Sequence, residues 1–155
     1  MKLRLYQVDA FADRPFAGNP AAIVPNAAGL TEEDMVRISE ELGLEVGFVL
    51  PPDERGADVR LRFFIDRNED TLSGHVLLAA LVSMVDRGIF RPTPEGCLLH
   101  VETLAGVFAA RLNGSPGSPL RAEFEMPNPR FGEHVPVDEV AVHGRDQKEQ
   151  DPWPA

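Results

Sequence analysis

The protein has 155 residues, of which 43% are hydrophobic and 26% are charged, a balance that excludes a disordered or fibrous chain. Its formal net charge of -10 repels phosphate backbones and anionic lipids, so we expect neither nucleic acid nor a membrane surface as a partner. The single cysteine, Cys97, excludes an internal disulfide and a multi-cysteine metal site. The apolar run from Val76 to Val85 is too short for a membrane span, and we expect a cytoplasmic protein.

The N-terminal part of the chain is predicted to form two strands separated by a loop. Alternating apolar residues predict a strand over residues 1–9, whose inward side chains are Leu3, Leu5 and Val8. Proline and glycine mark a loop over residues 13–20, and a short apolar strand over residues 21–25 follows.

The first helix is predicted from its capping residues. Thr31 can act as the N-cap, with Asp34 three residues later as a variant of the capping box. Leu30 and Met35 are spaced to form a hydrophobic staple, and Gly43 suits the position just past the helix end. The apolar stripe of this helix consists of Met35, Ile38 and Leu42.

Two further strands are predicted before the second helix. They cover residues 46–50 and 59–65, and alternation places four side chains of the second strand inward: Val59, Leu61, Phe63 and Ile65. Residues 66–71 are predicted to form a polar turn.

The second helix is apolar on every face. It is predicted to begin at Ser73-Gly74-His75, to run to about Arg87 and to end at Gly88. A helix without a polar face is expected to be buried all round. In a domain of this size, burial of that kind requires a sheet that curls around the helix.

Three strands and a polar tail complete the predicted organisation. The strands cover residues 97–103, 107–112 and 120–126. Residues 143–155 contain almost no apolar side chains, and residues 130–155 are expected to form a loosely ordered polar tail. The predicted domain is therefore a single unit over residues 1–129.

The start of the second helix is the first candidate site. Free backbone N–H groups and the positive end of the helix dipole form an anion site there, Gly74 permits a close approach to the backbone, and His75 places an imidazole beside it. The alternative is that Ser73 is a plain N-cap and His75 a polar residue of the first turn. The sequence contains no phosphate-binding loop and no dinucleotide glycine motif, and its four histidines lack metal-ligand spacing: His75, His100, His134 and His143.

Glu45 is the second candidate. It lies between a predicted helix end and a predicted strand, with apolar residues on both sides. A partly buried carboxylate at such a position could transfer protons near neutral pH. The alternative is an exposed loop glutamate in an acidic protein.

The order of several short motifs resembles the PhzF family, the phenazine-biosynthesis-like isomerases. The matching motifs are Val8-Asp9-Ala10-Phe11, Arg14-Pro15-Phe16, Gly18 to Val24, the Glu-x-x-Phe-Val segment at Glu45, Asn68-Glu69 and Gly74-His75. The resemblance covers most of residues 3–112.

This resemblance implies a fold, a reaction and a set of site residues. The fold would be an α+β, diaminopimelate-epimerase-like lobe with a curled mixed or antiparallel sheet around one central buried helix. The reaction would be cofactor-independent proton transfer on a small carboxylic acid, such as a dihydro-hydroxyanthranilate or an amino-acid-like compound. The resemblance implies Glu45 and His75 as catalytic residues, and it implies as substrate-binding residues Asn19, Ser73, Gly74 and His75.

The sequence also departs from the family pattern. Val76 replaces the proline that follows the Gly-His pair, Leu44 replaces a small or polar residue, and nothing after Leu112 resembles the family's second lobe. We therefore expect an isomerase whose cleft a second subunit completes in a homodimer. Two alternatives stay open: a non-catalytic single-lobe protein that binds a small anion or self-associates, and a truncated half of a two-lobed isomerase.

Overall fold

The computed structural model of the protein describes residues 2–14, 16–93, 95–114, 120–126, 128 and 132. The predicted polar tail, residues 130–155, lies outside the described residues apart from Gly132. The domain boundary at residue 129 therefore stays a prediction.

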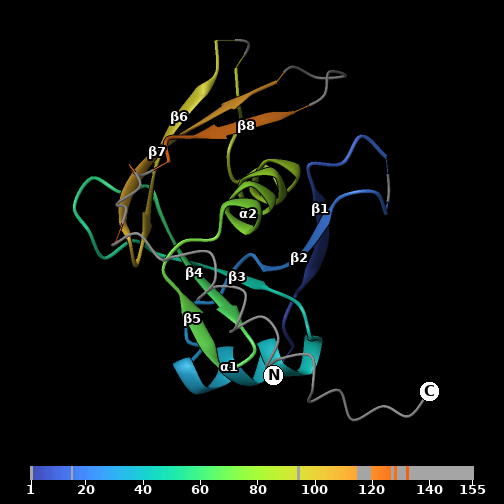
Figure 1. The fold of residues 1–155 in the computed structure, drawn as a ribbon. Coiled ribbons are helices and arrows are strands. Elements are labelled where there is room, and N and C mark those ends of the chain that lie inside the picture. The colour runs from blue at the N-terminus through green and yellow to red at the C-terminus, as the bar shows by residue number, and fades with distance from the viewer. Residues whose placement is uncertain are drawn as a thin grey trace.

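The described residues form one curled sheet and two helices. The sheet has eight strands in the order β1-β2-β3-β4-β6-β7-β8, with β5 paired to β4, and it curls around one of the helices (Figure 1). The strands are β1 (Tyr6–Ala10), β2 (Asn19–Val24), β3 (Val46–Leu50), β4 (Val59–Ile65), β5 (Asn68–Asp70), β6 (Cys97–Thr103), β7 (Gly106–Asn113) and β8 (Arg121–Phe124). The helices are α1 (Glu32–Leu42) and α2 (Gly74–Asp86).

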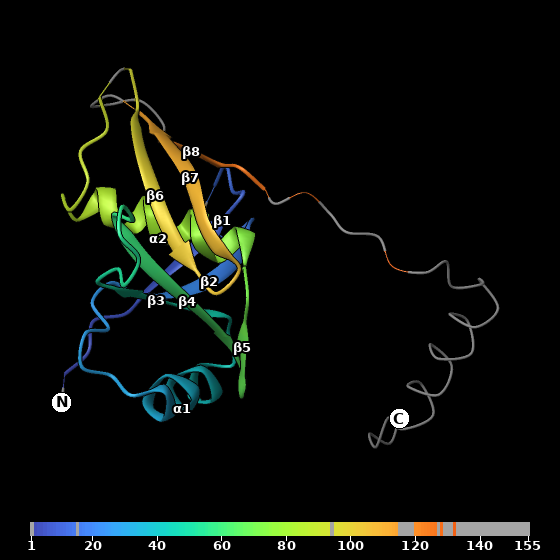
Figure 2. The same ribbon diagram turned by 90° about the vertical axis from the view of Figure 1, so that its left-hand side faces the viewer.

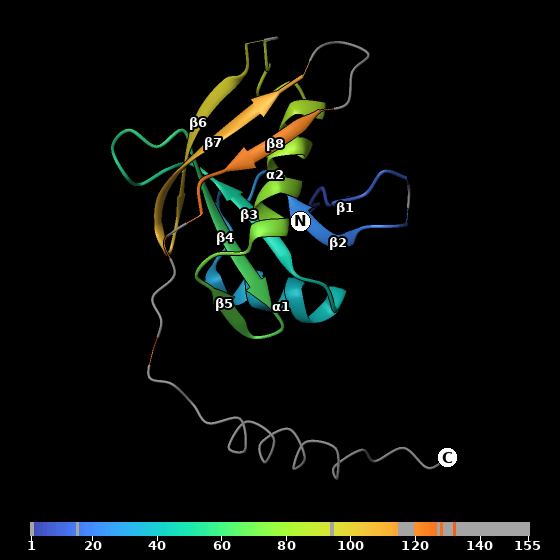
Figure 3. The same cartoon turned by 45° about the horizontal axis from the view of Figure 1, so that its top comes forward.

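The sheet is mixed. β2 runs parallel to β3, and β4 runs parallel to β6, whereas the other neighbouring strands are antiparallel. The helices lie on opposite sides of β3 and β4 (Figure 2), and α2 lies between β8 and β1 (Figure 3). The predicted α+β fold, a curled sheet around one central helix, is confirmed.

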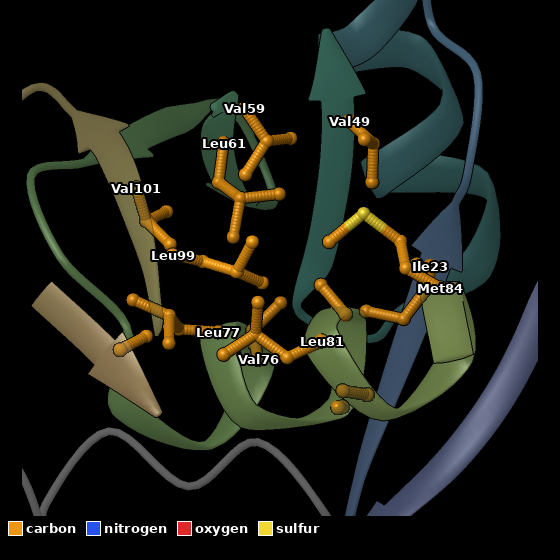
Figure 4. Close-up of a cluster of buried hydrophobic side chains, with 14 of the residues drawn as sticks. Ile23, Val49, Val59, Leu61, Val76, Leu77, Leu81, Met84, Leu99 and Val101 are labelled. Atoms are coloured by element: carbon orange, nitrogen blue, oxygen red, sulfur yellow. The ribbon is translucent and has the colours of Figure 1, made fainter. Parts of the chain in front are cut away.

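The two faces of the sheet carry two separate apolar clusters. The α2 cluster fills the concave side (Figure 4) and has at its centre Ile23, Leu61, Val76, Leu77, Leu81, Met84, Leu99 and Val101. The α1 cluster lies on the opposite face and contains Ala22, Val24, Met35, Val46, Phe48 and Phe64. Burial of each large side chain in such a cluster contributes about 1.5–3 kcal/mol to stability.

The predicted start and end of α1 are confirmed. The Thr31 hydroxyl accepts a hydrogen bond from the Asp34 backbone N–H at 3.1 Å, and the Asp34 carboxylate accepts one from the Thr31 backbone N–H at 2.9 Å. Gly43 ends the helix with a φ of 59°, a left-handed conformation that glycine adopts without a side-chain penalty. The turn at Gly43 thus sets the point at which the chain leaves α1 for the segment that carries Glu45.

Four sequence predictions about the fold were wrong or incomplete. The first strand begins at Tyr6, and Leu3 and Leu5 are exposed rather than inward. Ile65 is also exposed, because it lies at the end of β4 beyond the cover of the helices. The expected turn at 66–71 contains β5, a short polar strand that the β4 pairing stabilises. The helix α2 is buried on most of its surface, but Leu78 is only half-buried.

Candidate functional site

The candidate site lies where β3 begins and α2 begins. Glu45 immediately precedes β3, and its carbonyl accepts a hydrogen bond from the Ala22 backbone N–H of β2 at 3.0 Å. This bond continues the parallel pairing of β2 with β3 and fixes the Glu45 backbone at the start of β3, an inner strand of the sheet. His75 is the second residue of α2.

The structure places the side chains of Glu45 and His75 next to each other. His75 Nε2 lies 3.5 Å from Glu45 Oε2, and both side chains are mostly buried, with exposed fractions of 16% and 15%. The other carboxylate oxygen, Glu45 Oε1, is buried and has no hydrogen-bond partner among the described residues. The alternative of an exposed loop glutamate is therefore wrong: Glu45 is a half-enclosed carboxylate with one oxygen facing an imidazole.

Ser73 occupies the N-cap position of α2 but does not cap the helix with its side chain. Its hydroxyl makes no hydrogen bond to the first-turn N–H groups and instead lies 3.3 Å from His75 Nδ1. Ser73 is therefore the N-cap residue by its backbone position, as the alternative predicted. The prediction that its side chain caps the helix is wrong. The first N–H groups of α2 keep their capacity to bind an acceptor, and the helix dipole favours an anion at this end.

Gly74 lies beneath an aromatic ring that no sequence motif indicated as part of the site. A Cβ at Gly74 would lie 3.4 Å from Cζ of Phe124, in β8. Phe124 therefore occupies part of the space that the missing side chain of Gly74 leaves free. The contact joins residues 50 positions apart, so a local motif could not have revealed it.

Asn19 is the predicted site residue that the structure does not bring into contact with the others. It is the first residue of β2, is exposed and is opposite Ala10 of β1. The parallel register, with Ala22 opposite Val46, puts Asn19 and Glu45 at the same end of their strands. Among the described residues no hydrogen bond joins Asn19 to Glu45 or His75.

The described part of the chain contains neither a cluster of metal-ligand side chains nor a helix of membrane-spanning length and hydrophobicity. No group of three or more histidine, cysteine, aspartate or glutamate side chains there could hold a metal ion. Within the same residues no helix is both long and apolar enough to cross a membrane. Cys97 is half-buried and packs against the α2 cluster.

The comparison with known protein families decides the assignment. The sequence matches the family described as phenazine biosynthesis-like protein, PhzC-PhzF, over residues 8–148. The chain belongs to the PhzF family. The match includes every residue of the candidate site.

Individual relatives agree with this assignment. The chain is 49% identical over 80 residues to an uncharacterized isomerase of Pseudomonas aeruginosa, a match that covers 51% of this chain and 30% of that protein. It is 34% identical over 125 residues to the trans-2,3-dihydro-3-hydroxyanthranilate isomerase of Pseudomonas fluorescens, which covers 80% of this chain and 42% of that enzyme. A crystal structure of a PhzF-family protein from Bacillus anthracis superposes with a TM-score of 0.75 at 32% identity, over 92% of this chain and 47% of that one.

The lengths of these proteins differ from that of the chain. This PhzF-family chain spans less than half of each of the three proteins it matches. The isomerase activities of the relatives therefore belong to proteins that are much longer than this chain.

Proposed function

We propose that the protein is a PhzF-like isomerase that moves a proton on a small carboxylic acid without a cofactor. The observation that carries this proposal is the pairing of Glu45 with His75 at the uncapped start of α2, with Oε2 and Nε2 3.5 Å apart. A base beside an anion site is what abstraction of a proton next to a carboxylate requires. The isomerase relatives support the same reaction class.

The proposed mechanism assigns a step to each side of the site. The first-turn N–H groups of α2 bind the substrate carboxylate, and His75 lies beside Glu45 at the same helix start. Glu45 removes a proton from a carbon of the substrate, and the electron pair of that C–H bond moves into the conjugated system. Glu45 then returns the proton to a different carbon, so the product differs from the substrate only in the positions of a hydrogen and a double bond. Asn19, at the same end of the sheet, would contact the part of the substrate farther from α2.

A second copy of the chain would complete the cleft in this proposal. The resemblance implies a site between two lobes, of which this sequence resembles one, and a cleft left open to water weakens electrostatic stabilisation because water screens it. The loop between β1 and β2 carries two large exposed apolar side chains, Phe11 at 76% and Phe16 at 95% exposure. Exposed aromatic side chains of this kind favour a protein–protein contact. Sedimentation analysis should show a dimer at assay concentration, and a monomer alone would contradict this part of the proposal.

Proton transfer can be tested directly by deuterium incorporation. The protein is incubated in D2O with dihydro-hydroxyanthranilate and a panel of amino-acid-like carboxylic acids, and incorporation is followed by mass spectrometry. Glu45→Gln should reduce incorporation by about 100-fold or more, because the general base is removed. Glu41→Gln, which makes the same change at an exposed position of α1, is the matched control and should retain the rate. Equal rates in the wild type and Glu45→Gln would refute the assignment of Glu45.

A non-catalytic single-lobe protein is the second candidate, and the short span of the chain relative to its relatives is the observation that favours it. In that case the wild type would bind a small carboxylate without incorporating deuterium, and Glu45→Gln would bind equally well. A truncated half of a two-lobed isomerase would show the same absence of exchange. Addition of the second half of a relative as a separate chain would then be expected to restore activity. A cytoplasmic location stays a prediction.

A further inference from the structure

Ser73 uses its side chain in an unusual way for a residue that precedes a helix. A serine at this position normally accepts a hydrogen bond from an N–H group of the first turn. Ser73 makes no such bond, although the residue is only 6% exposed and its hydroxyl therefore has little access to water. The partner that the structure provides is His75 Nδ1, at 3.3 Å.

The other nitrogen of the same imidazole determines the direction of this hydrogen bond. His75 Nε2 faces Oε2 of Glu45 at 3.5 Å. An ionised carboxylate has no hydrogen to donate, so the nitrogen that faces it has to carry the hydrogen. In a neutral imidazole the second nitrogen is then an acceptor, and a hydroxyl group can supply the donor that it needs.

We infer that Ser73 is a positioning residue: its hydroxyl donates to Nδ1 and holds His75 as the Nε2–H tautomer, directed at Glu45. The Ser73 hydroxyl then has an acceptor in Nδ1, and the Nε2–H group of a neutral His75 faces the Glu45 carboxylate. This arrangement needs no buried positive charge. The state of the imidazole follows from geometry alone, whereas its value for proton transfer rests on the proposed function.

This arrangement also separates the two oxygens of Glu45. Oε2 faces His75 Nε2 at 3.5 Å, and Oε1 has no hydrogen-bond partner among the described residues. The two oxygens therefore differ in their surroundings, because Oε1 is closed to solvent and Oε2 lies beside the imidazole. Ser73 therefore acts on the reaction through His75 and does not contact the reacting atoms.

The tautomer can be read by long-range nitrogen–proton NMR of the 15N-labelled protein near neutral pH, with the His75 signals assigned from a His75→Gln variant. The wild type should show a protonated Nε2 and an acceptor Nδ1. Ser73→Ala should shift His75 toward a mixture of tautomers, and Ser73→Thr, which keeps a hydroxyl, should restore the wild-type pattern. Ser83→Ala is the matched control, because Ser83 lies in the same helix and bonds the Ala79 carbonyl instead of an imidazole.

Stability and activity measurements separate this role from a structural one. Because the Ser73 side chain does not cap α2, Ser73→Ala should lower the unfolding midpoint by no more than the loss of one partly buried hydrogen bond. Where the wild type incorporates deuterium, Ser73→Ala should lower the turnover rate about ten-fold or more with little change in KM, because the imidazole is misdirected and substrate contacts are kept. An unchanged tautomer in Ser73→Ala, or a wild-type histidine protonated at Nδ1 alone, would overturn the inference. Absence of deuterium incorporation in the wild type would refute the proposed function instead, and the NMR result would still decide the role of Ser73.

Discussion

Gly47 of β3 and Val76 of α2 lie so close together that a Cβ on the glycine would be 2.7 Å from Cγ1 of the valine. Gly47 is two residues after Glu45, and Val76 is one residue after His75. The contact therefore sets the distance between the strand that carries the carboxylate and the helix that carries the imidazole. Only a residue without a side chain permits β3 and α2 to approach this closely.

Substitution of Gly47 by alanine should force the two elements apart. We expect Gly47→Ala to cost about 1–3 kcal/mol of unfolding free energy, as overpacked cores do, and to weaken proton transfer. The double variant Gly47→Ala/Val76→Ala removes the methyl group in the way, so its loss should be smaller than the sum of the two single losses. Urea unfolding of the four proteins measures this coupling, and strictly additive losses would show that the contact is not the cause.

Arg62 of β4 pairs with two carboxylates, one in β5 and one in α1. Its guanidinium donates to both oxygens of Glu69 at 2.6 Å and to Glu32 at 2.7 Å, and the hydrogen bonds to Glu69 are the main reason its pKa lies above the ordinary value. Arg62→Ala leaves the mostly buried Glu69 without a partner and should cost about 2 kcal/mol. Glu32→Gln is the matched control, because that side chain is largely exposed, and it should cost less than about 1 kcal/mol. Equal losses in the two variants by denaturant unfolding would argue against this account.

Asp34 should make the stability of α1 depend on pH. Hydrogen bonds from the backbone and side chain of Thr31 lower the pKa of Asp34 below its ordinary value. A carboxyl group whose pKa is lower in the folded state stabilises that state above its unfolded pKa, about 3.9, and loses this contribution as the pH falls through the folded pKa. Asp34→Asn should therefore be less stable than the wild type at pH 7, and the difference should shrink below pH ~4.

Unfolding of Asp34→Asn at pH 7, 5 and 3 tests this prediction. Glu33→Gln, a neighbouring acid of the same helix turn that takes no part in the cap, should show no comparable convergence with the wild type at low pH. Thr31→Ala removes the other half of the cap and should cost about 1 kcal/mol at pH 7. A deficit in Asp34→Asn that is as large at pH 3 as at pH 7 would contradict the role of the charge.

Glu102 holds the loop before β4 against β6. Its buried carboxylate accepts hydrogen bonds from the backbone N–H groups of Asp53 and Glu54, at 2.8 Å and 2.9 Å through the same oxygen, and faces Arg60. Glu102→Ala leaves both N–H groups without this acceptor and should cost about 2–3 kcal/mol. Glu102→Gln keeps a carbonyl oxygen and should lose about half as much. Limited proteolysis should cut the loop in the alanine variant first, and protection equal to the wild type would refute the prediction.

Local signals in the sequence predicted much of the fold. The cap of α1 depends on Thr31 and Asp34, three residues apart, and β3 was predicted over the same residues that form it. β5 was missed because it is polar: its pairing with β4 and the ion pair of Glu69 with Arg62 stabilise it, and both contacts are to residues outside the segment. Leu3 has the alternation of a strand residue, but the paired strand starts only at Tyr6.

The sequence pointed to Glu45 and His75, which the structure brings together, and not to the details of their contacts. Glu45 and His75 are 30 positions apart, and the resemblance to the family was the signal that connected them. The orientation of the Ser73 hydroxyl was not predictable, because a helix N–H and an imidazole nitrogen compete for it within two residues. The contacts of Phe124 with Gly74 and of Gly47 with Val76 were missed because each depends on how two elements that are distant in the sequence pack.

The division of the core by the sheet has a consequence for how the protein opens. Along β3, Val46 and Phe48 face the α1 cluster, whereas Gly47 and Val49 belong to the α2 side. Detachment of α1 therefore exposes the α1 cluster to water and leaves the α2 cluster on the other face buried. Amide hydrogens of α1 should exchange with solvent through this partial opening, and those of α2 only when the whole molecule unfolds. The contact between Glu45 and His75 would thus survive fluctuations that transiently release the first helix.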